Sequence, residues 1–325
     1  MLVLITGATG KVGAVLLDRL LEDARWPDMR VRALCHNRPL PARDRLETVH
    51  GSISDSSVVD RAMADVTHVI HMATVKEDPR TAMDVSVKGM FWMLEAFRQS
   101  PIAKQFMLIS GDCVVGHIIN AFDTPITEHS PRRPYPGVYA LSKVLEEVML
   151  EQYYVQYGLN GCCLRAPWIM EKDDFRHALD FGDQFGGPSW DELLTAPQRA
   201  EYRANNRVPL LIDAKGQPLK RNFIHVNDLV AAMLAALDNP ATRQQLFNIA
   251  MNQPVDYGVV AERLRQTRGI SSVRIETPFH SNWLDNAKAR HTLGWQPRYD
   301  TLRMVDEAFD YQRAADDPRK IWYVG

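Results

Sequence analysis

Several features are scarce in this chain of 325 residues, and each absence excludes a class of protein. The four cysteines are Cys35, Cys113, Cys162 and Cys163, and their spacing fits neither a zinc site nor a disulfide framework. No apolar run is long enough to span a bilayer. The apolar start of the chain gives way to a glycine-rich turn after five residues, unlike a secretory signal. We therefore expect a protein of the reducing cytoplasm with no membrane partner.

An excess of charge of one sign is also lacking. The chain has 38 lysines and arginines against 40 acidic residues, so its formal net charge is −2 and it has no general nucleic-acid-binding footprint. None of its ten histidines forms a pair with HxxxH or HExxH spacing, so we predict no metal site. Hydrophobic residues make up 46% of the chain, as in an ordinary globular protein of one large or two modest domains.

The first thirteen residues carry the most informative pattern. An apolar run over residues 1–5 leads into Gly7, Gly10 and Gly13, spaced G-x-x-G-x-x-G, and an amphipathic stretch follows. This pattern predicts a buried parallel strand, a tight turn and the start of a helix. Glycines let the backbone approach a pyrophosphate, and the N–H groups and dipole of the helix start hold the phosphates. The sequence therefore predicts a nucleotide site at the N-terminus.

Apolar runs alternate with helix-like segments farther along the chain. We expect strands at 31–35, 66–72, 105–110 and 162–165, the last of them after a helix at 142–157. The alternation predicts right-handed βαβ units, and therefore an α/β fold with a Rossmann-type doubly wound parallel sheet.

The pattern changes in the second half of the chain, where a charged stretch over 171–207 predicts an insertion with short helices. We therefore assign residues 1–167 plus about 222–252 to the dinucleotide-binding Rossmann domain. The remainder, about 168–221 plus 253–325, would form a smaller, discontinuous substrate-binding domain.

Tyr139 and Lys143 form a second candidate site. On a helix, residues four apart share one face, so the phenol and the ammonium would point the same way. A nearby ammonium favours the phenolate and lowers the pKa of a tyrosine, which then exchanges a proton near neutral pH. Hydride transfer to or from a nicotinamide requires such a proton transfer at the substrate oxygen.

Together these motifs resemble the extended short-chain dehydrogenase/reductases of the NAD-dependent epimerase/dehydratase type. The resemblance runs nearly end to end, and it rests on Thr6–Gly13, Val69–Ala73, Ser110–Gly116, Tyr139–Lys143, Leu164–Pro167, Arg221–Asp228 and Leu293–Pro297. It implies a Rossmann fold, a nicotinamide cofactor and a carbohydrate-like small-molecule substrate. It also implies a homodimer that packs through helices around Met90–Phe97 and Ser142–Tyr157, with Met90, Met93, Met149 and Tyr153 as candidate interface residues.

The resemblance also implies site residues. Tyr139 would be the acid/base, Lys143 would bind the nicotinamide ribose, and Lys76 would reach the cofactor. The candidate cofactor-binding residues are Gly7, Thr9, Gly10, Lys11, Val12, Gly13, His36, Asn37, Arg38, Ser52, Ile53, Met72, Ala73, Thr74, Lys76, Ser110, Tyr139, Lys143, Ala166 and Pro167. The catalytic candidates are Tyr139, Lys143 and Ser110, and the substrate-binding candidates are Asp112, Trp168 and Arg221.

The chain departs from the family pattern beside the expected reacting oxygen. Gly111 stands where the family has a Ser or Thr whose hydroxyl polarises the substrate. Ser110 is adjacent, but strand side chains alternate between faces, so it does not automatically substitute. Asp112 keeps the first acid of the pair found in sugar dehydratases, whereas Cys113 replaces the second. A full dehydratase mechanism is therefore disfavoured, and Asp112, Ser142 or a water is left to supply the missing contact.

Two further departures concern the ligands. The second strand ends at Cys35 and is followed by His36, Asn37 and Arg38, so no carboxylate repels a 2′-phosphate and both NAD and NADP remain open. Trp168 replaces an asparagine that nucleotide-sugar enzymes have near the sugar. The bulky indole favours a smaller polyol, sugar acid or lactone, although plain packing would explain it equally.

The favoured function is therefore hydride transfer between NAD(P) and a secondary alcohol or ketone of a sugar, sugar acid or lactone-like substrate, with net oxidoreduction or epimerisation both open. A nucleotide-sugar 4-epimerase is the first alternative. A non-enzymatic NADP-binding sensor is the alternative of another class, supported by Gly111 and opposed by the retention of Tyr139 and Lys143. Arg221 would hold an anionic part of the substrate, unless it forms a structural ion pair with Asp228 or another nearby acid.

Overall fold

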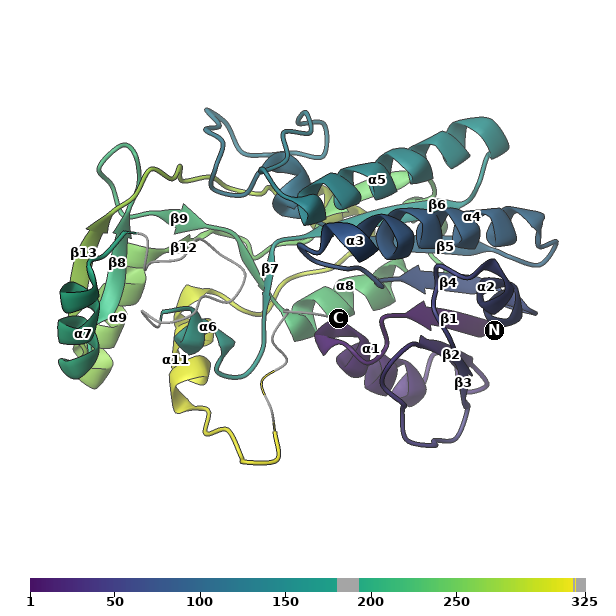
Figure 1. Ribbon diagram of the computed structural model, residues 1–325, viewed down its shortest axis with the longest axis horizontal. Coiled ribbons are helices and arrows are strands. Elements are labelled where there is room, and N and C mark those ends of the chain that lie inside the picture. Colours follow the sequence, from purple (N-terminus) through teal and green to yellow (C-terminus); the bar gives the residue numbers. More distant parts are fainter. Residues whose placement is uncertain (180–192, 318, 320–325) are drawn as a thin grey trace.

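A seven-stranded parallel sheet forms the centre of the molecule (Figure 1). The computed structural model describes residues 1–179, 193–317 and 319. The strand order is β11-β6-β5-β4-β1-β2-β3. The strands are β1 (Leu2–Thr6), β2 (Arg30–Cys35), β3 (Leu46–His50), β4 (His68–His71), β5 (Gln105–Gly111), β6 (Gly161–Ala166) and β11 (Gln245–Asn248).

From β1 the chain first adds strands on one side of the sheet, β2 and β3, and then continues on the other side with β4. The strand order therefore reverses between β1 and β4, and both strands pair in parallel with their neighbours. In the register, Val3 lies between Val31 of β2 and His68 of β4. Every residue of β1 is buried, as expected for a strand covered on both faces. Because a doubly wound sheet binds ligands where its strand order reverses, the carboxyl ends of β1 and β4 are the expected ligand site.

Helices cover both faces of the sheet. On one face, α1 (Lys11–Glu22) packs beside α8 (Val226–Ala236). On the other, α2 (Ser56–Met63), α4 (Gly89–Gln99) and α5 (Val138–Tyr157) enclose a second apolar cluster. Shorter helical segments occur between them: α3 (Pro79–Ala82), η1 (Met83–Lys88) and η2 (Asp112–Val115).

Most of the remaining elements lie beyond the carboxyl ends of the sheet strands, on the left in Figure 1, whereas η4 lies at the amino end of β5, where Thr242 accepts a hydrogen bond from Gln105. Three two-stranded pairings occur beyond the carboxyl ends, between β7 and β10, β9 and β12, and β8 and β13. The bounds are β7 (Trp168–Met170), α6 (Asp174–Ala178), α7 (Ala196–Ala204), β8 (Val208–Ile212), β9 (Lys220–Arg221), β10 (Phe223–His225), η4 (Pro240–Thr242), β12 (Val255–Asp256), α9 (Tyr257–Arg268), β13 (Ser272–Glu276), α10 (Ala287–Leu293) and α11 (Thr301–Asp310).

The predicted α/β fold is confirmed. The helix that carries Tyr139 begins at Val138, four residues before the expected start at 142, and Tyr139 therefore lies in its first turn. The return of the chain to the main sheet through β11 falls within the segment assigned to the Rossmann domain, but the division into two domains stays a prediction. Within the expected insertion, α6 and α7 are helical, and residues 180–192 lie outside the described part. No helix of the described residues is long and apolar enough to cross a membrane.

Candidate active site

A cavity of about 490 Å³ opens at the carboxyl ends of β1, β4, β5 and β6. It brings together most of the predicted site residues from segments far apart in the sequence. Those that line it are Gly7, Gly10, Lys11, Val12, Gly13, Met72, Thr74, Lys76, Ser110, Asp112, Tyr139, Lys143, Ala166, Pro167, Trp168 and Arg221. The other predicted residues, Thr9, His36, Asn37, Arg38, Ser52, Ile53 and Ala73, are not among the lining residues.

The glycine turn has the close approaches that its sequence predicts. Gly7 has a φ of +75°, and a Cβ there would stand 3.1 Å from the backbone carbon of Met72. A Cβ on Gly13 would stand 2.6 Å from Cα of Ala8, so only glycine lets α1 pack against the turn. No side chain caps the first turn of α1, whose N–H groups face the cavity end of β1.

These features fit a dinucleotide. An uncapped helix start beside a glycine turn holds a pyrophosphate through backbone N–H groups, and NAD(P), when bound there, would supply hydride exchange at the substrate carbon. The loop after β4 is fixed to the turn, since the hydroxyl of Thr6 accepts the N–H groups of Met72 and Ala73, each at 3.0 Å.

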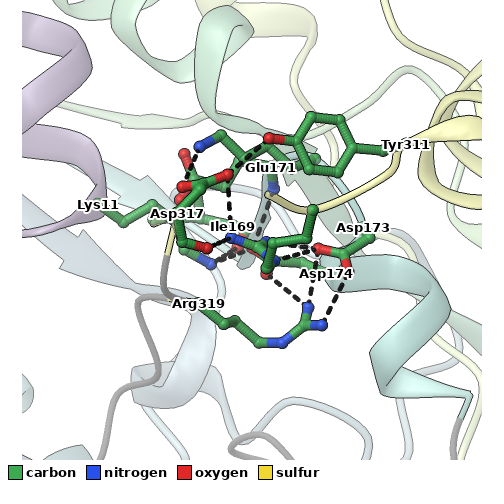
Figure 2. A network of polar contacts seen from close by, with 10 residues as sticks. Lys11, Ile169, Glu171, Asp173, Asp174, Tyr311, Asp317 and Arg319 are labelled. Carbon is green, nitrogen blue, oxygen red and sulfur yellow. Dashed lines mark hydrogen bonds and ion pairs between the residues drawn. The ribbon is translucent and has the colours of Figure 1, made fainter. Parts of the chain in front are cut away.

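The side chain of Lys11 has a different partner from the one expected. Its ammonium forms an ion pair with Asp174 and donates to the carbonyl oxygen of Ile169 at 3.1 Å, and both side chains of the ion pair are buried. Figure 2 shows that Arg319 also reaches Asp174 and binds the neighbouring Asp173. Lys11 therefore ties the glycine turn to the segment after β7, and only its backbone N–H is left for a pyrophosphate.

Two lysines flank Tyr139 within the cavity. The Lys76 nitrogen lies 3.5 Å from the centroid of the Tyr139 ring, and the Lys143 nitrogen lies 6.0 Å from it. Lys143 donates to the carbonyl oxygen of Ile109 at 3.1 Å and to Glu146 at 2.7 Å. Burial raises the pKa of Glu146 to about 7 and lowers that of Lys76 to about 8.

The expected lowering of the Tyr139 pKa by Lys143 does not occur in this state. Burial of the phenol raises its pKa well above the usual value, and nearby Cys113 and Glu146 add to the shift. The main physical reason is that the phenol loses its solvation; in addition, Lys143 forms an ion pair with Glu146, and Lys76 lies over the ring face. The sequence spacing predicted the shared face correctly, because both Tyr139 and Lys143 line the cavity.

Glu77 was missed by sequence reasoning, although it holds the start of the helix that carries Tyr139. Its carboxylate accepts the N–H groups of Val138 at 2.7 Å and Tyr139 at 3.3 Å, and the hydroxyl of Tyr135 at 3.0 Å. No side chain within the helix caps this end. A carboxylate at a helix N-terminus is stabilised by the free N–H groups and by the helix dipole. No local motif announces it, because the carboxylate belongs to the loop after β4.

Gly111 lies beside the tyrosine hydroxyl, as the family pattern requires of this position. A Cβ at Gly111 would stand 3.5 Å from the Tyr139 hydroxyl oxygen and 3.1 Å from Sγ of Cys113. The Ser110 hydroxyl instead donates to Glu147 at 2.7 Å, where Glu147 also binds Arg165. The alternation of strand side chains therefore points the Ser110 hydroxyl to Glu147 and keeps it from replacing the missing hydroxyl.

Arg221 and Trp168 form the far wall of the cavity. The guanidinium carbon lies 3.4 Å from the centroid of the indole ring, and Arg221 is only 4% exposed. The alternative of an ion pair with Asp228 is wrong: that carboxylate accepts the N–H groups of Arg298 and Tyr299 instead. Nη1 of Arg221 has no hydrogen-bond partner among the described residues. A buried cation with an unused donor, facing a cavity, is suited to an anionic or oxygen-rich ligand.

Asp112 and His117 form a pair that sequence reasoning did not foresee. Nδ1 of His117 lies 2.6 Å from Oδ1 of Asp112, and both residues line the cavity. The imidazole stacks on Tyr135 with ring centroids 5.2 Å apart. Only the position of His117 directly after the Ser110–Gly116 motif could have drawn attention to it.

The expected adenosine end of the site lies at the carboxyl edge of β2. Cys35 is buried at the end of that strand, and His36, Asn37 and Arg38 follow it as exposed residues. The hydroxyl of Ser52 contacts that of Ser54 at 2.8 Å, and Ile53 is buried against Gly89. No carboxylate occupies residues 35–38.

Comparisons with known proteins agree with this geometry. The model of the NAD dependent epimerase/dehydratase family matches residues 3–170. The chain is 25% identical to a putative UDP-glucose 4-epimerase of Methanocaldococcus jannaschii, covering 96% of this chain and 98% of that protein. It is 27% identical to a UDP-glucose 4-epimerase of Mycolicibacterium smegmatis, covering 95% and 98%.

Among solved structures, a short-chain dehydrogenase/reductase superfamily protein of Agrobacterium tumefaciens with bound NAD superposes with a TM-score of 0.78. It is 23% identical and covers 95% of this chain and 96% of its own. With a family match over more than half of its length, this chain belongs to the NAD dependent epimerase/dehydratase family and is an NAD(P)-dependent enzyme of the extended short-chain dehydrogenase/reductase type.

Proposed function

We propose that the chain catalyses NAD(P)-dependent hydride transfer at a secondary alcohol or ketone of a sugar acid or a related lactone-like carbohydrate. The observation that carries this proposal is the shared cavity of Tyr139, the glycine turn and Arg221. A proton-transferring phenol, a pyrophosphate cradle and a buried cation are the three parts that the reaction needs. Retention of both Tyr139 and Lys143 in the cavity gives the sensor alternative no support.

In the proposed reaction Tyr139 takes the hydroxyl proton during oxidation and returns it during reduction. Its raised pKa keeps the phenol protonated in the free protein. Lys143 is held 2.7 Å from Glu146, whose own pKa of about 7 lets protonation of that carboxyl release the ammonium. Once released, Lys143 would favour the phenolate and bind the ribose hydroxyls of the cofactor.

The substrate end favours a small, anionic molecule. Nη1 of Arg221 is buried without a partner among the described residues, so a carboxylate on the substrate would satisfy it. Trp168 covers the other face of the guanidinium at 3.4 Å and narrows the cavity there. Burial lowers the pKa of Arg221, and the neighbouring Tyr257 and Asp112 oppose this shift only in part, so an anionic ligand would further stabilise the buried charge.

A nucleotide-sugar 4-epimerase is the second candidate, and it is favoured by the two UDP-glucose 4-epimerases to which the chain is similar. That activity would require the diphosphate of the substrate to reach Arg221 past Trp168. It would also leave no net change in the cofactor, because the transient ketone is reduced again on its other face.

A panel assay distinguishes the two candidates. Purified protein is mixed with NAD+ or NADP+ and D-glucuronate, D-galacturonate, gluconolactone or UDP-glucose, and the absorbance of the reduced nicotinamide is followed. We expect a saturable signal with a sugar acid. Conversion of UDP-glucose to its 4-epimer, followed by NMR without a net absorbance change, would favour the second candidate. Tight cofactor binding with neither result would contradict both.

We also infer that two copies of the chain associate through α4 and α5. The four residues first expected at the interface do not suit it: Met90, Met93 and Tyr153 belong to the apolar core, and Met149 packs against that core. Three of the exposed apolar residues of α5 are instead Leu141, Val148 and Val155, which are spaced seven apart and therefore lie along one face. Phe91 of α4 is also exposed, at 39%.

A further inference from the structure

We infer that His117, held by Asp112, contacts the reacting oxygen of the substrate and replaces the hydroxyl that is missing at Gly111. This inference rests on the proposed function, since it assigns a second group to the same hydride-transfer site. It concerns a residue that no motif marks.

The backbone at His117 forms a tight turn, and the His117 side chain lines the cavity. Gly116 and His117 have successive positive φ values of +89° and +48°. A Cβ on Gly116 would stand only 2.5 Å from the carbonyl oxygen of Arg133, so that turn requires glycine. The carbonyl oxygen of His117 accepts a hydrogen bond from Asn282, whose own side chain accepts from Asn222 at 2.6 Å. A non-glycine residue in the left-handed region is held there by its surroundings, and such positions cluster at functional sites.

Asp112 determines which nitrogen of the imidazole faces the ligand. Nδ1 lies 2.6 Å from Oδ1 of Asp112, so the carboxylate forms an ion pair on the Nδ1 side of the ring when the imidazole is protonated. Nε2 belongs to a side chain that is 18% exposed and lines the cavity. With the imidazole protonated and its Nδ1 side facing Asp112, Nε2–H is the donor that is available to a substrate oxygen.

The pair is placed between the two ends of the proposed substrate. Asp112 follows Gly111 directly, and it interacts electrostatically with both Tyr139 and Arg221. His117, Tyr139 and Arg221 all line the same cavity. A substrate whose carboxylate binds Arg221 and whose hydroxyl meets Tyr139 thus has its reacting oxygen on the side of the Asp112–His117 pair.

The chemical step remains balanced with this assignment. The substrate hydroxyl gives its proton to Tyr139 and its carbon gives two electrons and one hydrogen to NAD(P)+, which leaves a carbonyl group. His117 takes no proton in the net reaction, because its Nε2–H donates to the substrate oxygen throughout and stays on the imidazole while that oxygen changes from hydroxyl to carbonyl. A donor that stabilises the developing charge on such an oxygen matters for rate, since removing one such donor lowers kcat about a hundredfold.

The test compares His117→Asn with the wild type, using NAD+ and D-glucuronate, or the compound of the panel above that the wild type turns over fastest. Asparagine tolerates the left-handed backbone and keeps an amide for Asp112, but it does not present Nε2. We expect kcat to fall by about 10- to 100-fold, with the NAD+ dissociation constant unchanged. The exposed His129, changed to asparagine, is the matched control and should have wild-type kcat.

Rescue separates contact with the substrate from a structural role. Gly111→Ser in the His117→Asn background returns a hydroxyl beside Tyr139. The kcat of this double variant should be at least tenfold higher than that of His117→Asn alone. The backbone of Gly111 is extended, with φ −133°, so serine fits if Cys113 yields by a few tenths of an ångström. Gly111→Ala in the same background adds the Cβ without the hydroxyl and should recover nothing.

Two results would overturn the inference: a wild-type kcat in His117→Asn, or a loss that Gly111→Ser and Gly111→Ala affect equally. If the wild type turns over no compound of the panel, the proposed function itself fails and this inference falls with it. The two failures are therefore distinguished by the activity of the wild type alone.

Discussion

The ammonium nitrogen of Lys76 lies 3.5 Å from the centroid of the Tyr139 ring, closer than that of Lys143 at 6.0 Å. The lysine four residues after Tyr139 is therefore not the nearest cation in this state. The two lysines come from opposite sides of the site, the loop after β4 and the helix α5. Two cations therefore lie near the proposed proton-transferring tyrosine, and sequence spacing alone assigns only Lys143 to it.

Lys76→Met should change how stability depends on pH. The pKa of Lys76 is about 8 in the folded chain against an ordinary value of 10.5, so between these pH values the unfolded chain binds more protons. Folding stability should therefore rise with pH across this range by about 1 to 3 kcal/mol more in the wild type than in Lys76→Met. Urea unfolding at pH 7, 8, 9 and 10 measures the difference.

Lys88, an exposed lysine paired with Asp84, provides the control for that comparison. Lys88→Met should keep the pH dependence of the wild type, since its charge is solvated in both states. Parallel curves for the wild type and Lys76→Met would contradict the lowered pKa of Lys76.

Asp174→Asn should destabilise the fold, because it leaves the Lys11 ammonium buried without its anionic partner. Breaking a buried ion pair costs about 3 kcal/mol or more, and both side chains of this pair are about 1% exposed. The matched control is Asp84→Asn, which removes the exposed partner of Lys88 and should cost less than about 1 kcal/mol. Equal unfolding midpoints in urea for the two variants would contradict the structural role of Lys11.

The sequence alone was sufficient for the features that short-range periodicity encodes. The glycine spacing predicted the turn and the start of α1, and the alternation of apolar runs predicted the parallel sheet. The four-residue spacing of Tyr139 and Lys143 predicted their common face. In each case the residues that determine the structure are neighbours in the chain, and the physical rule is local.

The contacts that could not be predicted join residues far apart in the chain. Asp174, the partner of Lys11, is 163 positions away, and Glu77 holds the start of α5 from 61 positions upstream. The pKa of Tyr139 likewise depends on how deeply the fold buries it, which no spacing reports. The contact between His117 and Asp112 likewise occurs across a turn in which Gly116 and His117 both have positive φ.

Val148→Glu should separate the proposed dimer into monomers. Val148 is 45% exposed in the middle of the apolar stripe on α5, and a buried, unpaired carboxylate at an interface is strongly unfavourable. Val259 on α9 is 44% exposed, so Val259→Glu is a matched control that should leave the dimer intact. Sedimentation velocity at micromolar concentration measures both. A monomeric wild type would contradict the inferred association.

Arg38→Ala should weaken the binding of NADP+ about tenfold while leaving that of NAD+ unchanged, as expected from the loss of one charge-assisted hydrogen bond. The reason is that Arg38 is exposed just after β2, where a 2′-phosphate would lie and where no carboxylate opposes it. Arg43→Ala, at an exposed arginine paired with Asp18, is the control. Equal effects of Arg38→Ala on both cofactors, measured by isothermal titration calorimetry, would show that Arg38 does not contact a 2′-phosphate.

The central claim is that Tyr139 transfers the proton that accompanies hydride transfer, and Tyr139→Phe tests it most directly. The substitution removes the hydroxyl and keeps the ring beneath Lys76. In the nicotinamide absorbance assay with D-glucuronate, or the panel compound that the wild type turns over fastest, we predict a loss of kcat of about a hundredfold or more. The dissociation constant of the cofactor should stay within about twofold of the wild type, because the phosphates are held by the glycine turn. Unchanged turnover in Tyr139→Phe would contradict the account.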